Sequence, residues 1–298
     1  MTILISCEMG GELVPPWLVR QPVSGERSVM EPAFVESAKI ETRRSEFPAE
    51  VNLSGAIGDE VNRSEANRSE INRQDESFQS GGSDLLPGQF PEKLPGDAAA
   101  RYVARRMASL LQSPLVENKY AADLIDVTRS SRHRSVMPPA VRKWPCEERD
   151  RLVQEVHAEY RNRIRNAVEQ HSLRHGFTIH ISIRSFALRS EGRLRRTDVG
   201  LLYDPSREDE MAFCLDWIDE MYDWAPMIRV RRNYPRRGTT ESIVTAMRNH
   251  FTADRYIGVE LLLNRAWAGR RVALRDQAIE GICRSLDEVL DFQSADAA

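Results

Sequence analysis

Charged side chains that could carry chemistry follow short apolar runs in this sequence. Glu12 comes soon after the apolar run 3–7, and Asp126 and Arg129 lie at the end of a second run, 122–127. Carboxylates can take up a proton or bind a metal ion, and a guanidinium can hold a carboxylate through two hydrogen bonds. If each run is a strand of a parallel sheet, these residues lie at its carboxyl edge, where open α/β sheets bind ligands.

A third apolar run, 177–183, carries polar side chains of its own. His180 alternates with Ser182 and Arg184, so the three side chains are expected on one face of a strand. Two interpretations of His180 stay open, a metal ligand or a histidine that is hydrogen-bonded in the core. We expect none of the remaining histidines to restore a metal site.

Four segments, taken in order, resemble the N-formylglutamate amidohydrolase family. The phrase DVGLLYDP at 198–205 connects them, and the resemblance spans nearly the whole chain outside a low-complexity segment. The four segments are SCEMGGELVP at 6–15, DVTRS at 126–130, HISIRSF at 180–186, and NYPRRG at 233–238 followed by YIGVE at 256–260.

The resemblance implies a fold like that of the zinc carboxypeptidases and the hydrolysis of N-formyl-L-glutamate to glutamate and formate. In such a site zinc polarises the formyl oxygen and activates a water molecule, a glutamate takes the proton, and an arginine binds the substrate carboxylates. By matching motifs, the resemblance implies Glu260 as the catalytic residue and Glu12 as a zinc ligand. The implied substrate-binding residues are Asp126, Arg129, Arg184 and Asn233.

The chain departs from the family pattern where the metal would be held. Met9 and Arg184 stand where the family has two zinc-binding histidines, and Leu262 replaces the second acid of the family's Glu-Leu-Glu strand end. A thioether suits copper(I) better than zinc, and a protonated guanidinium has no lone pair to offer a metal. The resemblance therefore implies a degenerate zinc site.

Two functions follow, and the sequence leaves both open. The first is a divergent amidohydrolase that uses Glu12 and Glu260 on an N-acyl amino acid. The second is a non-catalytic or regulatory protein in which Arg184 replaces zinc beside Glu8 or Glu12 and binds a small anion, such as a dicarboxylate.

Alternation of helix-like and strand-like segments predicts the fold class. We expect one α/β domain over 1–298, a three-layer sandwich whose mostly parallel or mixed sheet has helices on both faces. Helices are expected at 98–112, 147–171, 208–222, 241–251 and 270–292. Strands are expected at 3–7, 122–127, 177–183, 198–203, 227–230 and 256–263.

Residues 43–96 differ from the rest of the chain in composition. Polar residues dominate, and 61–73 contains a degenerate short repeat. Such a segment buries too little apolar surface to offset its ordering entropy. We predict a low-complexity, disordered insertion at about 43–96, with a short helix through the repeat as the alternative.

Composition narrows the class of partner. Lys and Arg total 42 against 45 Asp and Glu, for a net charge of -3, which gives no general case for nucleic acid or an anionic membrane. We predict that the arginine-rich stretch 229–237 forms a rim for an anionic substrate.

No apolar run approaches the length of a membrane span, and no signal peptide is evident. The four cysteines are scattered singly. We therefore expect a cytoplasmic protein.

Overall fold

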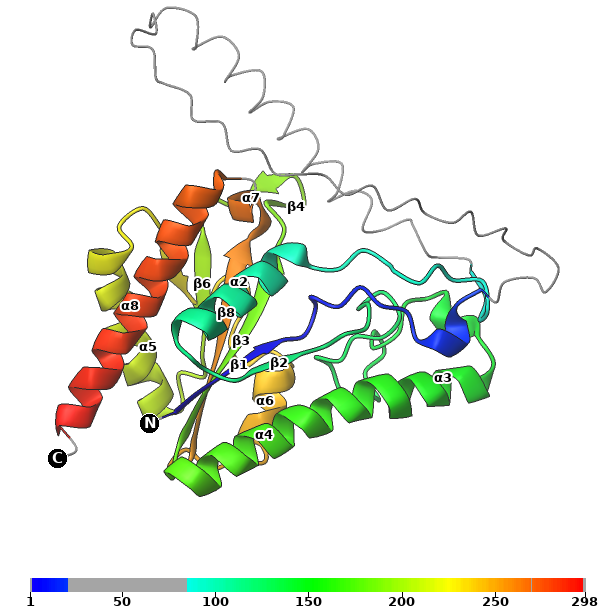
Figure 1. The fold of residues 1–298 in the computed structure, drawn as a ribbon, viewed down its shortest axis with the longest axis horizontal. Helices are drawn as coiled ribbons and strands as arrows, with labels where there is room; N and C mark the ends of the chain where they lie inside the picture. The colour runs from blue at the N-terminus through cyan, green and yellow to red at the C-terminus, as the bar shows by residue number, and fades with distance from the viewer. Residues whose placement is uncertain (1, 21–84, 269, 297–298) are drawn as a thin grey trace, which may run out of the picture.

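The structure, a computed structural model, describes residues 2–20, 85–268 and 270–296. A six-stranded sheet forms the middle layer (Figure 1), in the order β2-β1-β3-β8-β6-β7. Neighbouring strands are parallel except for β6 and β8, which are antiparallel. The strands of the sheet are β1 (Thr2–Cys7), β2 (Leu115–Glu117), β3 (Thr178–Phe186), β6 (Val199–Leu202), β7 (Val230–Arg232) and β8 (Tyr256–Asn264). A separate ribbon pairs β4 (Arg189–Ser190) with β5 (Arg193–Leu194).

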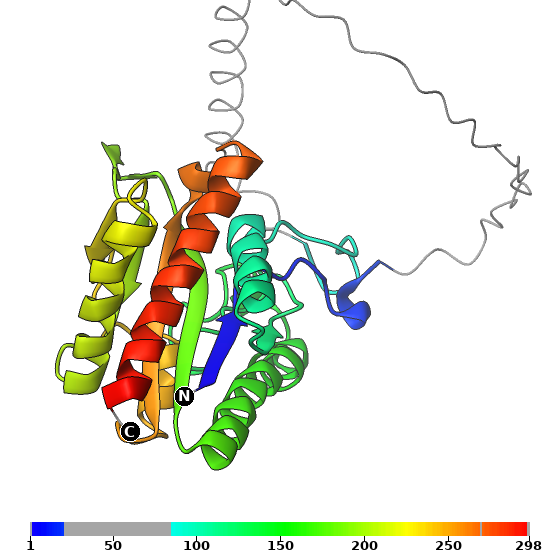
Figure 2. The ribbon, with the colours of Figure 1, turned by 60° about the vertical axis from the view of Figure 1, so that its left-hand side comes forward.

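Helices cover both faces of the sheet (Figures 1 and 2), which confirms the predicted fold class. On one face lie α2 (Ala98–Leu110), α5 (Glu208–Trp224), α7 (Arg265–Ala268) and α8 (Val272–Asp296). On the other lie α3 (Cys146–Leu152), η3 (Val153–Ala158), α4 (Glu159–His175) and α6 (Ile243–Arg248), with the short helices η1 (Pro16–Leu18) and η2 (Val141–Lys143). No helix in the described ranges is long and apolar enough to cross a membrane.

Side-chain alternation in β1 separates the two apolar layers. Ile3, Ile5 and Cys7 pack with α2, α5 and α8, whereas Leu4 packs with the layer of α4 and α6. Because the side-chain period of a strand is two, the polar residues that follow Leu4 at even positions face the layer of α4 and α6. This face, near the carboxyl edge of the sheet, is where the buried polar residues gather.

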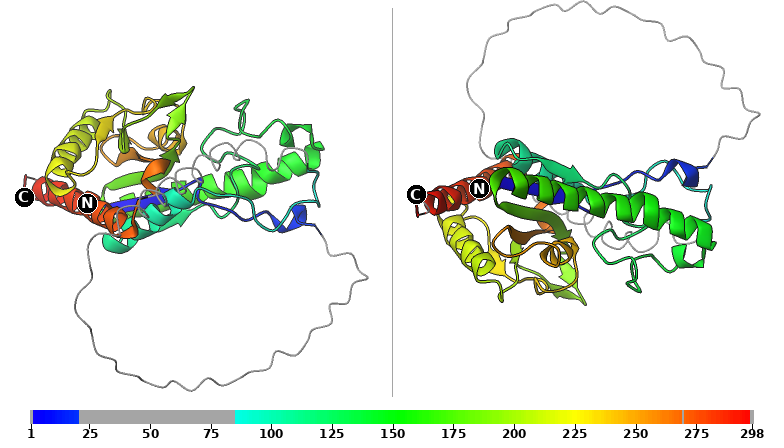
Figure 3. Two further views of the ribbon diagram at one scale, coloured as in Figure 1. Left: turned by 90° about the horizontal axis from the view of Figure 1, so that it is seen from above. Right: turned by 90° about the horizontal axis from the view of Figure 1, so that it is seen from below.

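Local signals begin α2 at its predicted first residue and end α4 at His175, beyond the predicted end at 171. The Asp97 carboxylate accepts a hydrogen bond from the Ala100 amide, 3.0 Å away, and begins α2. Gly176, with φ of 76°, ends α4 in the left-handed conformation that glycine adopts without a steric cost. The chain is continuously helical from α3 through η3 to α4. This long helix extends past the sheet to η1 (Figure 3), where the Arg151 guanidinium carbon lies 4.6 Å from the centroid of the Trp17 ring.

Two predicted strands are wrong. Residues 122–127 form turns, although Leu124, Ile125 and Val127 are buried, and the strand beside β1 is β2 instead. Apolar residues can be buried in a loop without forming the backbone hydrogen bonds of a sheet, so an apolar run alone cannot distinguish a strand from a buried loop. The strand predicted at 227–230 begins only at its last residue, because β7 spans Val230–Arg232.

Most of the predicted insertion, including the repeat at 61–73, lies outside the described residues. Its final part, 85–96, is described and belongs to the folded domain. Phe90 and Leu94 are buried in the layer of α3 and α4. The Val14 amide donates to the Glu92 carbonyl at 2.9 Å, which ties this segment to the chain after β1. The predicted boundary at residue 96 is therefore too late.

A buried ion pair joins α5, α6 and β8. Glu210 is 1% exposed, and its carboxylate accepts hydrogen bonds from Arg248 Nε at 2.9 Å and from the Gly258 amide at 3.1 Å. Arg248 in turn donates to the carbonyls of Gly238, at 2.7 Å, and Gly258, at 2.8 Å. The pair therefore anchors the loop between β7 and α6 to the sheet.

Glu210→Gln should lower the free energy of unfolding by about 3 to 5 kcal/mol, because glutamine keeps the shape but leaves the buried Arg248 charge uncompensated. Urea denaturation measures the change. Glu208→Gln, at an exposed position in the first turn of the same helix, is the matched control and should stay within about 0.5 kcal/mol of the parent. Equal effects of the two substitutions would contradict this account of Glu210.

Candidate functional site

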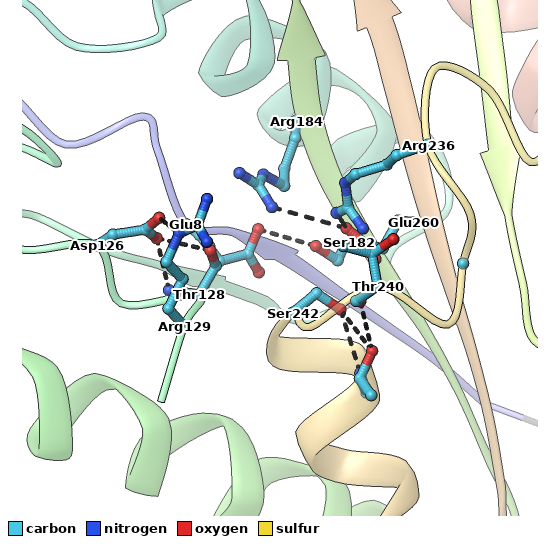
Figure 4. A network of polar contacts seen from close by, with 12 residues as sticks. Glu8, Asp126, Thr128, Arg129, Ser182, Arg184, Arg236, Thr240, Ser242 and Glu260 are labelled. Carbon is cyan, nitrogen blue, oxygen red and sulfur yellow. Dashed lines mark hydrogen bonds and ion pairs between the residues drawn. The ribbon is translucent and has the colours of Figure 1, made fainter. Parts of the chain in front are cut away.

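Three neighbouring parallel strands bring polar side chains into one row. Ser6 of β1 is in register with Ser182 of β3, which is in register with Glu260 of β8. All three residues are fully buried. Glu8 and Arg184 follow one pleat further along, on the same face. Figure 4 shows the side chains of Glu8, Ser182, Arg184 and Glu260 close together at this edge of the sheet.

Glu8 is a carboxyl group without solvent exposure. It accepts hydrogen bonds from the hydroxyls of Ser6 at 2.5 Å, Ser182 at 2.8 Å and Tyr160 at 3.4 Å. Burial raises the pKa of Glu8 above its ordinary value, although the bonds from Ser6 and Ser182 and the charge of Arg184 oppose this shift. Glu8 therefore holds a proton more strongly in the folded protein than in the unfolded chain.

His180 is a core histidine, which decides between the two interpretations left open by the sequence. Its Nε2 lies 2.8 Å from the Ser6 hydroxyl and its Nδ1 lies 2.8 Å from the Tyr256 hydroxyl. Burial lowers the pKa of His180 to about 3, so its ring is neutral near pH 7. Both ring nitrogens are used, and the hydrogen-bond chain continues through Ser6 to Glu8.

Glu260 is a second fully buried carboxylate, and it faces two guanidinium groups. Its Oε2 accepts a hydrogen bond from Arg236 Nη2 and lies 3.8 Å from Arg184 Nη1. Burial lowers the pKa of Arg236, while the charge of Glu260 opposes that shift. Within the described part of the chain, Glu260 Oε1 and Arg236 Nη1 are buried without a hydrogen-bond partner. An acceptor and a donor in this ion pair thus have hydrogen-bonding capacity that the described residues leave unused.

The loop after β2 adds a third carboxylate and a third guanidinium. Asp126 accepts hydrogen bonds from the Thr128 amide at 2.9 Å, the Thr128 hydroxyl at 2.6 Å and Arg129 Nε at 3.0 Å. Burial acts to raise the pKa of Asp126, but the bonds from Thr128 and the charges of Arg184 and Arg129 outweigh it and hold that pKa below its ordinary value. Arg184 thus acts on Glu8, Asp126 and Glu260 together (Figure 4).

Asn233 shapes the loop that carries Arg236. Its carboxamide oxygen accepts hydrogen bonds from the amides of Tyr203, at 3.2 Å, and Gly238, at 2.8 Å. A Cβ at Gly238 would come within 2.2 Å of the Tyr203 carbonyl oxygen, so only glycine fits this close approach. The oxygen of Asn233 is therefore committed to the backbone, and its assignment to substrate stays a prediction.

The residues at the implied zinc positions do not fit a zinc ion. Glu12 forms ion pairs with Arg101 at 3.2 Å and Lys93 at 3.6 Å, and Arg101 holds the pKa of Glu12 below its ordinary value. Arg184 offers a charged donor where a lone pair is needed, and Met9 offers a neutral thioether. Among the described residues, no group of three or more His, Cys, Asp or Glu could hold a metal ion.

The structure brings together most of the residues that the sequence singled out. Arg184, Glu260, Asp126 and Arg129 belong to one cluster, whereas Glu12 pairs with cations elsewhere. Glu8 feels the charge of Arg184, as one of the two functions left open by the sequence requires, and Arg236 belongs to the arginine-rich stretch expected to form a rim for an anion. Ser182 had no assigned role, although its alternation with Arg184 could have indicated one. Only the course of the Asn233 loop brings Arg236 to Glu260.

The comparisons with known proteins show a shared fold. No protein-family model matches the sequence, and no curated protein matches it. The crystal structure of the gene product Atu2144 from Agrobacterium tumefaciens is similar with a TM-score of 0.58 at 16% identity, over 98% of this chain and 91% of that chain. N-formylglutamate amidohydrolase from Ralstonia eutropha JMP134 is similar with a TM-score of 0.50 at 15% identity, over 67% of this chain and 84% of that chain. At these identities the relationship lies at the level of the fold.

The raised pKa of Glu8 predicts a specific pH dependence of stability. The folded state binds more protons than the unfolded state once the pH exceeds 4.5, the ordinary value for glutamate, so the free energy of unfolding falls as pH rises from there. Glu8→Gln should reduce this loss between about pH 5 and 7.5. Urea denaturation of parent and variant at both pH values measures this change in the free energy of unfolding.

Glu12→Gln is the matched control. The pKa of Glu12 is lowered, so this group is ionised in both states over the same pH window and its removal should leave the pH dependence unchanged. If parent and Glu8→Gln lose the same free energy of unfolding between the two pH values, Glu8 does not hold its proton as described.

Proposed function

We propose that this protein is an N-formylglutamate amidohydrolase-like protein that binds a small carboxylate ligand, a dicarboxylate or an N-acyl amino acid, without a metal ion. Arg184, Arg236 and Arg129 form the anion-binding cluster, and Arg184 supplies the positive charge that zinc supplies in the family implied by the sequence motifs. In this proposal the family reaction is lost and binding is retained.

The observation that carries the proposal is the position of Arg184. Its guanidinium lies 3.8 Å from Glu260 Oε2 and acts electrostatically on Glu8 and Asp126. No hydrogen bond within the described residues uses its donors, and its side chain is 18% exposed. A guanidinium has five N–H donors in a fixed plane, so Arg184 can bind a carboxylate through two of them.

The charges of the cluster also favour an anion. Burial raises the pKa of Glu8, so this carboxyl opposes the three guanidiniums less than an exposed glutamate would. A ligand carboxylate can pair with these guanidiniums, and partly buried arginines make such pairing stronger than it is on an open surface.

A binding measurement tests the proposal. Isothermal titration calorimetry should show saturable binding of glutarate or N-formyl-L-glutamate to the metal-free protein. Arg184→Gln should weaken binding by about tenfold or more, because a charge-assisted contact is lost. Arg189→Gln, which removes an exposed arginine on β4, is the matched control and should leave the affinity unchanged. Absence of binding by the parent would exclude the proposal.

A divergent amidohydrolase remains the second candidate, and the unpartnered Oε1 of buried Glu260 favours it. A carboxylate oxygen without a partner could accept a proton from an attacking water molecule. Our proposal predicts no turnover of N-formyl-L-glutamate with any divalent metal supplied. Metal-dependent turnover that is lost in Glu260→Gln would establish the amidohydrolase and contradict the non-catalytic assignment.

Restoring imidazoles at the two implied ligand positions tests whether Arg184 stands in the place of zinc. The double substitution Met9→His and Arg184→His should create a zinc site beside Glu8, because two neutral imidazoles and a carboxylate are a common zinc ligand set. Elemental analysis after zinc incubation and gel filtration should find zinc in the variant and none in the parent. If the variant retains no more zinc than the parent, the two positions do not share a site.

A further inference from the structure

A second cationic site lies behind the loop that carries Arg129. A cavity of about 210 Å³ lies between the helical layer of η3 and α4 and the end of α6. It is separate from the cluster of Arg184 and Glu260, neither of which lines it. Its polar lining comes from Ser131, His157, Arg161, Asn162, Arg165 and His250.

The side chains that line the cavity offer more hydrogen-bond donors than acceptors. Arg161 Nη1 donates to the carbonyls of Val127 at 3.1 Å, Thr128 at 3.3 Å and Arg129 at 3.2 Å. No hydrogen bond within the described residues uses its Nε or Nη2. Arg165 donates from Nη2 to the Asn162 oxygen at 3.1 Å, which turns one cation and one amide toward each other at the same site.

No carboxylate lines this cavity within the described chain. Glu241 and Asp126 act electrostatically on Arg161, but hydrogen bonds commit both carboxylates elsewhere. Glu241 accepts from the Ser130 amide at 2.7 Å, and Asp126 accepts from Thr128 and Arg129. Two guanidiniums, an amide and a hydroxyl around a small cavity are groups that recognise an oxyanion.

We propose that the cavity between α4 and α6 binds a small oxyanion with the size and charge of inorganic phosphate or of a phosphate monoester group. The volume is below the usual range of drug-sized pockets, so it suits a single anionic group rather than a whole cofactor. Arg165 and Arg161 supply the charge, and Ser131 and Asn162 supply neutral donors.

The same residues connect this cavity to the Arg129 loop. His157 Nε2 lies 2.7 Å from the Arg129 carbonyl oxygen, and Arg161 donates to that same oxygen. Burial lowers the pKa of His157, and because a carbonyl oxygen only accepts, the His157 Nε2–H donates this bond. The back of the loop thus rests on the oxyanion cavity while the Arg129 guanidinium faces Asp126.

Arg165 is the residue to change, because Arg161 anchors the Arg129 loop and its removal would disturb the fold. Inorganic phosphate is titrated into the full chain at low ionic strength and followed by calorimetry. We expect saturable binding by the parent and a loss of about tenfold or more in Arg165→Gln. Arg174→Gln, which removes an exposed arginine further along α4, is the matched control and should bind as the parent does.

Arg184→Gln distinguishes the two cationic sites. Phosphate affinity that is unchanged in Arg184→Gln but lost in Arg165→Gln supports the cavity, whatever the outcome for glutarate. Phosphate affinity that depends on Arg184 and not on Arg165 overturns the proposal and places the anion in the Arg184 cluster. Absence of phosphate binding, or an equal loss in Arg165→Gln and Arg174→Gln, overturns it as well, since equal losses indicate attraction by the general charge of the helix.

Discussion

The pairing of Arg184 with buried carboxylates is the interaction on which the candidate site depends. Glu260 is fully buried beside two guanidiniums, and Glu8 and Asp126 feel the charge of the same Arg184. Isolated buried charges are costly, so such groups persist only when they are paired or neutralised. In the function proposed above, the guanidinium of Arg184 takes over the electrostatic task of a bound cation, and it needs no lone pairs from its neighbours.

The remainder of the fold holds these charges in position. Parallel pairing of β1, β3 and β8 puts Ser6, Ser182 and Glu260 in one row. Asn233 and the buried Glu210–Arg248 pair hold the two ends of the loop that brings Arg236 to Glu260. Backbone hydrogen bonds and buried pairs tolerate little displacement, so the guanidiniums are presented in a defined geometry before any ligand arrives.

The Arg129 loop has a cation on each side. Its own guanidinium faces Asp126, while Arg161 and His157 hold its carbonyl from the side of α4. The fold shared with Atu2144 and with the Ralstonia eutropha amidohydrolase does not by itself say what these groups bind. Function resides in the side chains at the sheet edge, and in the function proposed above those side chains bind an anion rather than a divalent metal.

Periodicity in the sequence was sufficient to predict the α/β class and the strands from which Arg184 and Glu260 are presented, because these depend on nearest neighbours along the chain. The chemistry of a guanidinium was sufficient to show that Arg184 cannot bind a metal. The turns at 122–127, the burial of Phe90 and Leu94, and the meeting of Arg236 with Glu260 depend on contacts between distant segments. Only the tertiary structure decides them, because the same local pattern suits several partners until packing selects one.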